Sequence, residues 1–508
     1  MALLLGDLLR RHASRSPDKT AYVVGPHRVS YRRFNEMANR LAHALGARGV
    51  RRGDRVATLA QNRLEYPAIY FALAKLGAIH VPVNFRYRAN EVRYTLAQSE
   101  SHTMFVAAEY TDLVDGIRGD LPALRDVIPL DGDASGTAAD LMARASDVEP
   151  VSDVDERDPH VFLYTSGTTG DPKGAMLSHR SYVLQSGYTQ GMVGLGEDDV
   201  GLCMFPMFHM GGWAAPLGYW ASGGTVVIME KADPGEILRT VARERVSYLY
   251  LIPTLYNAVL ALPEFERADL SSLRALGSGT SVMTEAQVRT IVERFRNPNL
   301  FIVYGQTEAG PVASLRPRDV PRKPTSVGKP ALNVDVRVVD AAGDDVCHGE
   351  AGEIVCRSEY NMLGYWRLPE ATAQTIRDGW VHTGDLATVD EEGFLFIAGR
   401  VKEMIKCGGE NIFPAEVERC LLAHPAIAEA AVFGVPDAHW GEVAVAAIVR
   451  KPGATLAEAD VVEHVRAHLA GYKKPRHVEF RDALPRTAST RQVQKTLLRE
   501  EWLRARGS

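Results

Sequence analysis

The stretch Tyr-Thr-Ser-Gly-Thr-Thr-Gly-Asp-Pro-Lys-Gly at residues 164–174 constrains this chain more than any other segment. Its glycines let the backbone pass close to a bulky ligand, and its hydroxyls and lysine supply hydrogen-bond donors. Apolar runs at 161–163 and 175–177 flank it, so we expect a strand, a loop and a second strand. This composition favours a polyphosphate as the ligand. A Ser/Thr/Gly-rich surface linker is the alternative.

The common P-loop is excluded for this segment. That motif needs Gly-Lys-Ser/Thr at the opening of a helix, and here Pro172 precedes Lys173.

Size and charge narrow the class of protein. The chain has 508 residues, which predicts two or three domains. A net charge of −5 argues against nucleic acid as the main partner. No apolar run approaches the ~20 residues that span a bilayer, and the opening Met-Ala-Leu-Leu-Leu is too short for a secretory signal. We therefore predict a cytoplasmic protein without a membrane span.

The cysteines indicate neither a disulfide framework nor a zinc site, because their number is odd and their spacing scattered. We expect most of them to be small buried apolar side chains. The five are Cys203, Cys347, Cys356, Cys407 and Cys420.

The order of elements predicts an α/β protein. Helix-like and strand-like stretches alternate over residues 1–100 and again over about 180–310, which predicts sheets with helices on their faces. Residues 131–160 have the composition of a surface connection. Short strands and turns dominate 330–400, and an α+β pattern begins after Gly399-Arg400.

Several further motifs follow the glycine-rich loop in a fixed order, and together they resemble the acyl-adenylate-forming superfamily. That superfamily includes acyl-CoA synthetases, 4-coumarate–CoA ligases, luciferases and adenylation domains. The resemblance covers essentially the whole chain. The motifs are Thr165–Gly174, Pro-Met-Phe-His at 206–209, Gly-Ser-Gly at 277–279, Tyr-Gly-Gln-Thr-Glu at 304–308, Thr-Gly-Asp at 383–385, Gly-Arg at 399–400 and Gly-Gly-Glu-Asn-Ile at 408–412.

The resemblance implies an architecture. The large domain would span 1–399, with two stacked α/β sheets and a β-rich subdomain, and a small mobile α+β lid would span 400–508. Ligands would bind in the cleft between the two domains, and the lid would rotate between half-reactions.

The resemblance also implies a nucleotide site for MgATP. Thr307 would bond the α-phosphate and Glu308 would help to hold Mg²⁺, a hard cation that prefers carboxylate oxygen. Asp385 would accept from the ribose hydroxyls, Arg400 would contact the ribose, and Lys402 would lie at the hinge. The other residues implied for the cofactors are Thr165, Ser166, Gly167, Thr168, Thr169, Gly170, Lys173, Gly279, Tyr304, Gly305 and Gln306. A solvated loop acid, a turn aspartate and solvated surface charges are the ordinary alternatives for these residues.

A further group of residues would serve the acid and coenzyme A. By resemblance, His209 lines the gap between the acyl pocket and the ATP site, and Gly277, Gly279 and Gly305 keep that pocket open. Gly408 and Gly409 would line the pantetheine tunnel. A buried core histidine and plain turn glycines are the alternatives.

The implied reaction has two steps. A carboxylate attacks the α-phosphate of MgATP to give acyl-AMP and pyrophosphate, and coenzyme A then displaces AMP. Trp213, Tyr219 and Trp220 follow His209, and bulky rings there would shorten the pocket, which favours an aromatic or medium-chain acid; packing in the core is the alternative for these rings. We expect a monomer or homodimer.

The chain departs from the family pattern near its C-terminus. The family has Pro-x-Thr-x-x-Gly-Lys there, and its lysine bridges the carboxylate and the α-phosphate. This chain has Pro-Arg-Thr-Ala-Ser-Thr-Arg-Gln-Val-Gln-Lys at 485–495, so Arg491 or Gln492 takes the lysine's place, depending on the side from which the residues are counted. Lys495 is a third possible substitute. An adenylate-forming enzyme with a non-CoA acceptor or another anion such as nitrite, and a non-catalytic binding protein, therefore stay open beside the CoA ligase.

Overall fold

The computed structural model describes residues 3–132, 135–165, 171–407, 410–486 and 492–506. The described part of the chain falls into two compact units, each built from segments that are separate in sequence. Unit 1 comprises Met1–Pro324, Pro330–Asp335 and Arg357–Val381, and unit 2 comprises Thr325–Lys329, Val336–Cys356 and His382–Ser508. The domain boundary expected between residues 399 and 400 stays a prediction.

One sheet of unit 1 carries the glycine-rich segment. Its strands follow the order β18-β8-β7-β4-β3-β5-β6, and the pairs between β7 and β6 are parallel, whereas β8 runs antiparallel to β7 and to β18. The central strands are buried along nearly their whole length, as expected for parallel strands covered on both faces. The bounds are β3 Arg55–Leu59, β4 Ile79–Pro82, β5 Thr103–Val106, β6 Asp126–Pro129, β7 Pro159–Thr165, β8 Lys173–Ser178 and β18 Gly364–Tyr365.

A second sheet of unit 1 carries the Gly-Ser-Gly and Tyr-Gly-Gln-Thr-Glu segments. It runs β14-β13-β12-β11-β9-β10-β1-β2, parallel from β13 to β1 and antiparallel at the two ends. The bounds are β1 Thr20–Val24, β2 His27–Ser30, β9 Val200–Cys203, β10 Thr225–Ile228, β11 Tyr248–Tyr250, β12 Ala275–Gly279, β13 Leu300–Gln306 and β14 Gly310–Leu315.

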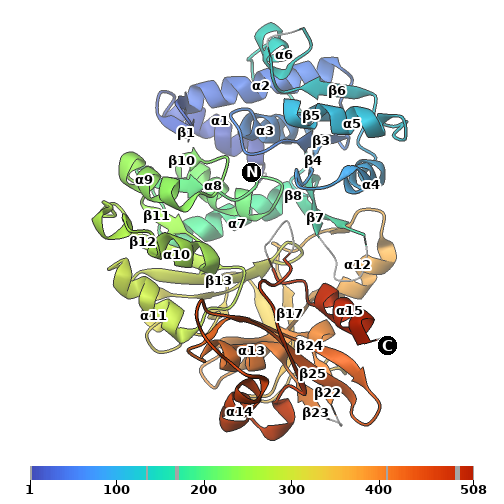
Figure 1. The fold of residues 1–508 in the computed structure, drawn as a ribbon. Coiled ribbons are helices and arrows are strands. Elements are labelled where there is room, and N and C mark those ends of the chain that lie inside the picture. Colours follow the sequence, from blue (N-terminus) through green and yellow to red (C-terminus); the bar gives the residue numbers. More distant parts are fainter. Residues whose placement is uncertain (1–2, 133–134, 166–170, 408–409, 487–491, 507–508) are drawn as a thin grey trace. The chain divides into compact units, whose positions relative to one another are not determined.

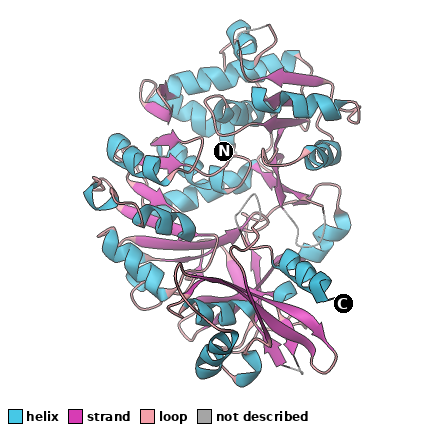
Figure 2. Ribbon diagram, viewed as in Figure 1, coloured by secondary structure: helices cyan, strands magenta, loops and turns pink. Residues whose placement is uncertain are grey.

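Helices flank these sheets (Figures 1 and 2). Their ends follow local chemistry: Ser30 caps α2 by accepting from the Arg33 N–H, and Gly77 ends α3 in the left-handed conformation at φ 72°. The helices of unit 1 are α1 Leu5–Arg15, α2 Tyr31–Ala47, α3 Tyr66–Leu76, α4 Ala89–Ser99, α5 Thr111–Arg118, α6 Ala138–Arg144, α7 His179–Val193, α8 Gly211–Ser222, α9 Pro234–Glu244, α10 Pro253–Leu260, α11 Glu285–Arg294 and α12 Pro369–Thr375.

The core of unit 1 holds the aromatic residues that were expected to shorten a pocket. Trp213 is fully buried, stacks on Tyr70 at 3.8 Å between ring centroids, and donates from Nε1 to the Met207 carbonyl at 2.6 Å. Trp220 donates from Nε1 to the Ala21 carbonyl at 3.0 Å, and Tyr219 is equally buried. These rings pack the core, so they give no ground for a short acyl pocket.

Unit 2 contains two small sheets and the last three helices of the described chain. Strands β16 (Asp335–Val339), β17 (Gly352–Arg357), β20 (Trp380–Val389) and β21 (Leu395–Arg400) form one sheet. The other contains β22 (Ile405–Cys407), β23 (Glu410–Ile412), β24 (Ile427–Asp437), β25 (Gly441–Arg450) and β26 (His477–Phe480). Helices α13 (Pro414–Leu422), α14 (Glu458–His468) and α15 (Lys495–Arg506) contribute Leu421, Val461 and Leu498 to its core. Strand β19 (Ile376–Arg377), whose residues belong to unit 1, pairs with β20, and β15 is Lys329–Pro330.

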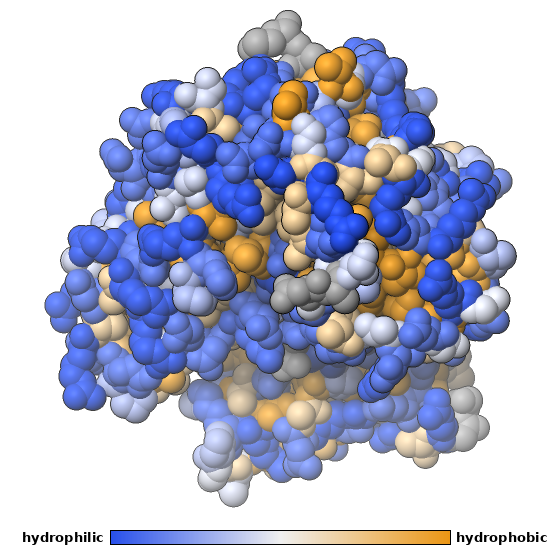
Figure 3. All heavy atoms as spheres, turned by 90° about the horizontal axis from the view of Figure 1, so that it is seen from above, coloured by the Kyte–Doolittle hydropathy of each residue, from blue (hydrophilic) through white to orange (hydrophobic). Residues whose placement is uncertain are grey.

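The predicted α/β class is confirmed, with two helix-flanked sheets in unit 1 and an α+β region at the C-terminus. Hydrophilic residues dominate the face shown in Figure 3, where apolar residues form smaller groups. Among the described residues, no helix has the length and apolar character needed to cross a membrane.

Candidate active site

The carboxylate of Glu308 is the meeting point of segments that are far apart in sequence. Its Oε1 accepts hydrogen bonds from the Thr165 Oγ1 and the Tyr365 hydroxyl, each at 2.9 Å. Both donors are neutral, so neither brings a positive charge to the carboxylate. Three oxygen-bearing side chains therefore converge on one half-buried point of unit 1.

The backbone explains why these side chains meet. Thr165 ends β7 and pairs with Lys173 at the start of β8, so the strands on either side of the glycine-rich segment form an antiparallel pair. Strand β18 adds to β8 with Tyr365 opposite Ala175. The Met362 N–H donates to the Glu308 carbonyl at 2.8 Å and ties the segment before β18 to the end of β13.

Lys173 lies over the ring of Tyr365, with Nζ 5.3 Å from the ring centroid. The two strands predicted on either side of the glycine-rich segment are confirmed as β7 and β8. Ser166, Gly167, Thr168, Thr169 and Gly170, which were predicted to bind the nucleotide, lie outside the described residues.

The Tyr-Gly-Gln-Thr-Glu segment crosses from β13 into the turn before β14. Thr307 is buried at 8 % exposure, whereas Tyr304 and Gln306 are half-buried. Gly310 closes the turn at φ 68°, and a Cβ on Gly305 would lie 2.4 Å from the Gly310 carbonyl oxygen. Glycine at 305 is therefore required by close backbone packing in this turn.

The Gly-Ser-Gly segment is β12, and two tyrosines of the neighbouring β11 cover it. A Cβ on Gly277 would lie 2.0 Å from the Tyr248 hydroxyl, and one on Gly279 would lie 2.4 Å from both the Tyr250 hydroxyl and the Val303 carbonyl oxygen. These glycines make room for tyrosine rings.

His209 sits in the loop before α8. It is half-buried, and its Nδ1 accepts from the Gly211 N–H at 3.2 Å, which places the proton of a neutral ring on Nε2. Burial lowers the pKa of His209, so the ring is neutral near pH 7.

In unit 2, the predicted ribose-contacting residues face each other across two strands. Asp385 on β20 pairs with Arg400 on β21, and the Arg400 Nε lies 2.9 Å from the Asp385 Oδ1. Asp385 is buried, whereas Arg400 is about half exposed. Lys402 follows in the 3₁₀ turn Val401–Glu403 and is exposed.

Lys495, a possible substitute for the missing lysine, is already engaged. Its Nζ lies 2.7 Å from the Glu403 Oε2 and 2.8 Å from the Glu418 Oε1. Burial opposes its charge, but the two carboxylates outweigh burial and raise the pKa of Lys495. Gln492 also has an interaction partner in the structure. Arg491, Gly408 and Gly409 lie outside the described residues.

Tyr365 was missed by the sequence analysis. It is buried beside Glu308 and Lys173, and burial together with the Glu308 charge raises the pKa of its hydroxyl. Its segment carries no catalytic motif, so only the pairing of β18 with β8 reveals its place.

Family models match both parts of the chain. Residues 9–366 match the AMP-binding enzyme family and residues 416–491 match the AMP-binding enzyme C-terminal domain. The chain belongs to the AMP-binding enzyme family, and the predicted membership of the acyl-adenylate-forming superfamily is confirmed.

Relatives match along nearly the whole chain. A feruloyl-CoA synthase from an Amycolatopsis species is 38% identical over 96% of both chains, and an indoleacetate–CoA ligase from Aromatoleum aromaticum is 38% identical over 95% of both. The crystal structure of the anthranilate CoA ligase AuaEII in complex with anthranoyl-AMP matches with a TM-score of 0.92, 31% identity and coverage of 100% of this chain and 99% of that one. The amide bond synthetase McbA from Marinactinospora thermotolerans matches with a TM-score of 0.89, 29% identity and coverage of 98% and 100%.

The predictions about site residues, subcellular location and oligomeric state stay predictions.

Proposed function

We propose that this protein is an ATP-dependent carboxylate–CoA ligase that forms an acyl-AMP intermediate and acts on an aromatic or medium-chain acid. The observation that carries the proposal is the convergence of Thr165, Glu308 and Tyr365, with Lys173 beside them, from segments that match the AMP-binding family. The relatives that match nearly the whole chain are acid–CoA ligases by name, in agreement with the predicted acid–thiol ligase.

Lys173 and the hydroxyls around it would bind the polyphosphate of ATP. Lys173 begins β8 directly opposite Thr165 at the end of β7, so its ammonium and the Thr165 hydroxyl belong to neighbouring strands. A point-charge ammonium beside hydroxyl donors suits phosphate oxygens.

The residues around Glu308 fit a magnesium ion. One carboxylate and two hydroxyl oxygens converge there, a donor set of hard oxygen atoms of the kind that Mg²⁺ prefers. Glu308 would hold the ion with the phosphates, and Thr165 and Tyr365 would orient its carboxylate. Bound Mg²⁺ supplies neutralisation of the polyphosphate charge.

The proposed reaction proceeds in two steps. A carboxylate oxygen of the acid attacks the α-phosphorus, and the bond from that phosphorus to the bridging oxygen of pyrophosphate breaks. The coenzyme A sulfur then attacks the acyl carbon, loses its proton and releases AMP. The protein contributes mainly positioning and charge stabilisation, with Thr307 bonding the α-phosphate.

The other predicted residues keep their proposed roles. The buried Asp385 carboxylate would accept from the ribose hydroxyls, Arg400, which is paired with it, would contact the ribose, and the exposed Lys402 would lie at the hinge. The neutral His209 would border the acyl pocket, and Gly408 and Gly409 would line the path of coenzyme A.

An aromatic acid is the better supported substrate class. Trp213 and its neighbours do not support this substrate class, because their rings pack the core. Support now comes from the names of relatives at 38% identity, which act on ferulate and indoleacetate.

A non-CoA acceptor is the second candidate, and one observation favours it. McbA, which matches with a TM-score of 0.89, is an amide bond synthetase, so an amine takes the acyl group there. Because the segment at 485–495 departs from the family pattern, an amine is also a candidate acceptor for this chain.

The test is release of pyrophosphate from ATP by the full chain with ferulate, indoleacetate, benzoate, octanoate and palmitate. Each acid is offered with coenzyme A, with a panel of amines, and without an acceptor, and products are identified by mass spectrometry. CoA thioesters of the aromatic acids or octanoate are expected. Amides without thioesters would support the second candidate, and ATP binding without any pyrophosphate would overturn both.

A further inference from the structure

A cysteine and two histidines of unit 2 gather where helices α13 and α14 pack together. Cys420 lies on α13, and His464 and His468 lie one helical turn apart on α14. One potential ligand atom from each residue lies within 4.8 Å of the others, a set that no other group of metal-binding residues in the described part of the chain matches. Cys420 and His464 are half-buried and His468 is exposed, so the group is reachable from solvent.

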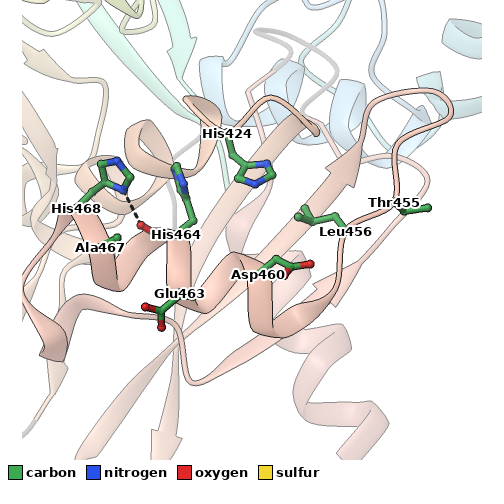
Figure 4. Close-up of a pocket in the computed structure, with 8 residues that line it drawn as sticks. All are labelled: His424, Thr455, Leu456, Asp460, Glu463, His464, Ala467 and His468. Carbon is green, nitrogen blue, oxygen red and sulfur yellow. Dashed lines mark hydrogen bonds between the residues drawn. The ribbon is translucent and has the colours of Figure 1, made fainter.

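Backbone carbonyls orient both imidazoles. The His464 Nε2 lies 2.9 Å from the Cys420 carbonyl oxygen, and the His468 Nδ1 lies 2.7 Å from the His464 carbonyl oxygen, the contact dashed in Figure 4. A carbonyl accepts only, so each of these nitrogens carries a proton and the other nitrogen of each ring keeps its lone pair. Metal-bound histidines are held in this way, with the second nitrogen donating to a carbonyl or carboxylate.

We propose that Cys420, His464 and His468 bind a divalent transition-metal ion, with zinc as the ion that fits best. One thiolate and two imidazoles form the soft and borderline donor set that selects zinc, cobalt, nickel or copper over magnesium and calcium. Tetrahedral zinc holds its nitrogen and sulfur ligands about 3.5 Å apart. The three ligand atoms already lie within 4.8 Å of one another, so the exposed His468 and half-buried Cys420 side chains would rotate inward to reach that spacing.

The remaining residues of the pocket leave the fourth position to solvent. Figure 4 shows the rings of His468, His464 and His424 in a row along one side of the pocket. The His424 Nδ1 accepts from the Ala426 N–H at 3.2 Å, so His424 packs edge-on against His464 without offering a ligand. Asp460 accepts from the Ala457 N–H, and Glu463 lies 3.6 Å from Arg466.

Such an ion would link α13 to α14 within the C-terminal unit. It would be independent of the nucleotide site, because none of its ligands belongs to the residues assigned to ATP, the acid or coenzyme A. The ion would therefore stabilise this unit whether or not the enzyme is turning over.

The experiment uses the full chain without a polyhistidine tag, stripped of metal and free of nucleotide, and titrated with Co²⁺. We expect one Co²⁺ per chain with a thiolate-to-cobalt charge-transfer band, which Zn²⁺ abolishes by displacement. Cys420→Ser removes the band, and His468→Gln weakens binding by about tenfold or more, as expected for loss of a ligand. Zn²⁺ should also raise the Tm of the wild type but not of Cys420→Ser.

Two variants serve as controls. His424→Gln changes a histidine of the same pocket that is not a ligand, and Cys347→Ser changes the exposed cysteine, so both should keep the band and the affinity. A band that persists in Cys420→Ser, or affinity that is unchanged in His468→Gln while both variants stay folded by circular dichroism, would overturn the proposal.

Discussion

The Thr165 Oγ1 donates to the Glu308 Oε1 at 2.9 Å and so joins the glycine-rich hairpin to the segment after β13, 143 residues further on. If Glu308 holds Mg²⁺ against the polyphosphate, Glu308→Gln removes the charge and keeps the shape. We expect pyrophosphate release to fall by about 10² to 10³, the usual effect of removing a positioned group that stabilises transition-state charge. The rate is measured at saturating ATP and acid with the folded state checked by circular dichroism.

Tyr365→Phe should have a smaller effect on pyrophosphate release than Glu308→Gln. It removes one of the two donors to Glu308 and leaves the carboxylate, so a loss of about tenfold is expected, as for a hydrogen bond to a charged group. Raised Mg²⁺ should recover part of the loss in Tyr365→Phe and none in Glu308→Gln. Full activity in Glu308→Gln would contradict the assignment.

Lys495 is expected to act in the structure of unit 2 and not in adenylation. Its ammonium is shared by Glu403 and Glu418, with only 17% of its side chain exposed. Lys495→Met leaves two carboxylates without their cation and should lower the free energy of unfolding by about 2 kcal/mol, less than a fully buried pair would cost. Urea titration measures the loss.

The adenylation rate separates this role from catalysis. Lys495→Met should leave pyrophosphate release close to wild type under conditions where the variant is folded. A lysine restored by Arg491→Lys or Gln492→Lys should raise the rate by about 10², because it supplies a positioned charge donor. Loss of adenylation in folded Lys495→Met would show instead that Lys495 is the substitute.

Three buried histidines of unit 1 should make the protein sensitive to acid. Burial lowers the pKa of His80 to about 3 and of His179 to about 4, and lowers that of His160 well below its usual range, with the neighbouring histidines adding to the effect for His160. The folded state keeps all three neutral, whereas the unfolded chain protonates them below pH about 6.5. Stability is therefore full above pH 6.5 and declines as the pH falls.

The size of this decline is measurable. At pH 5.5, each histidine should cost about 1.4 kcal/mol of unfolding free energy relative to pH 7.5. Urea titrations at the two pH values test it, and His179→Asn should remove about one third of the histidine contribution. A free energy of unfolding that does not change between pH 7.5 and 5.5 would contradict the buried neutral state.

Gly279 should tolerate no side chain. A Cβ there would lie 2.4 Å from the Val303 carbonyl oxygen, and backbone cannot move away cheaply. Gly279→Ala should cost about 1–3 kcal/mol and raise the KM for the acid. Gly187→Ala is the matched control, because that helical glycine has open space and the change should stabilise by up to about 1 kcal/mol. Equal denaturation midpoints for the two variants would contradict the close packing at Gly279.

Local pattern was enough to predict the order of elements. The flanking apolar runs predicted the β7–β8 hairpin because its strands are short, buried and bounded by glycine, and the register between Thr165 and Lys173 follows from that hairpin. The α+β pattern expected after Gly399-Arg400 is likewise confirmed, and α13 and α14 are two of its helices.

The sequence pattern could not predict contacts between side chains that are far apart along the chain. Tyr365 reaches Glu308 only because β18 adds to β8, and Lys495 is held by Glu403 and Glu418 only because α15 begins beside α13. The rings of Trp213 and Trp220 were ambiguous in sequence, since the same spacing suits a pocket wall and a core. The cluster of Cys420 with His464 was invisible because 44 residues separate them and no metal-ligand spacing links them.

The central claim is transfer of AMP to a carboxylate, and an oxygen-isotope measurement tests it most directly. Ferulate or another accepted acid labelled with ¹⁸O in its carboxylate is turned over with ATP and coenzyme A, and the nucleotide product is analysed by mass spectrometry. The account predicts AMP that carries one labelled oxygen taken from the acid. ADP as the product with the label in inorganic phosphate, or AMP without label, would contradict it.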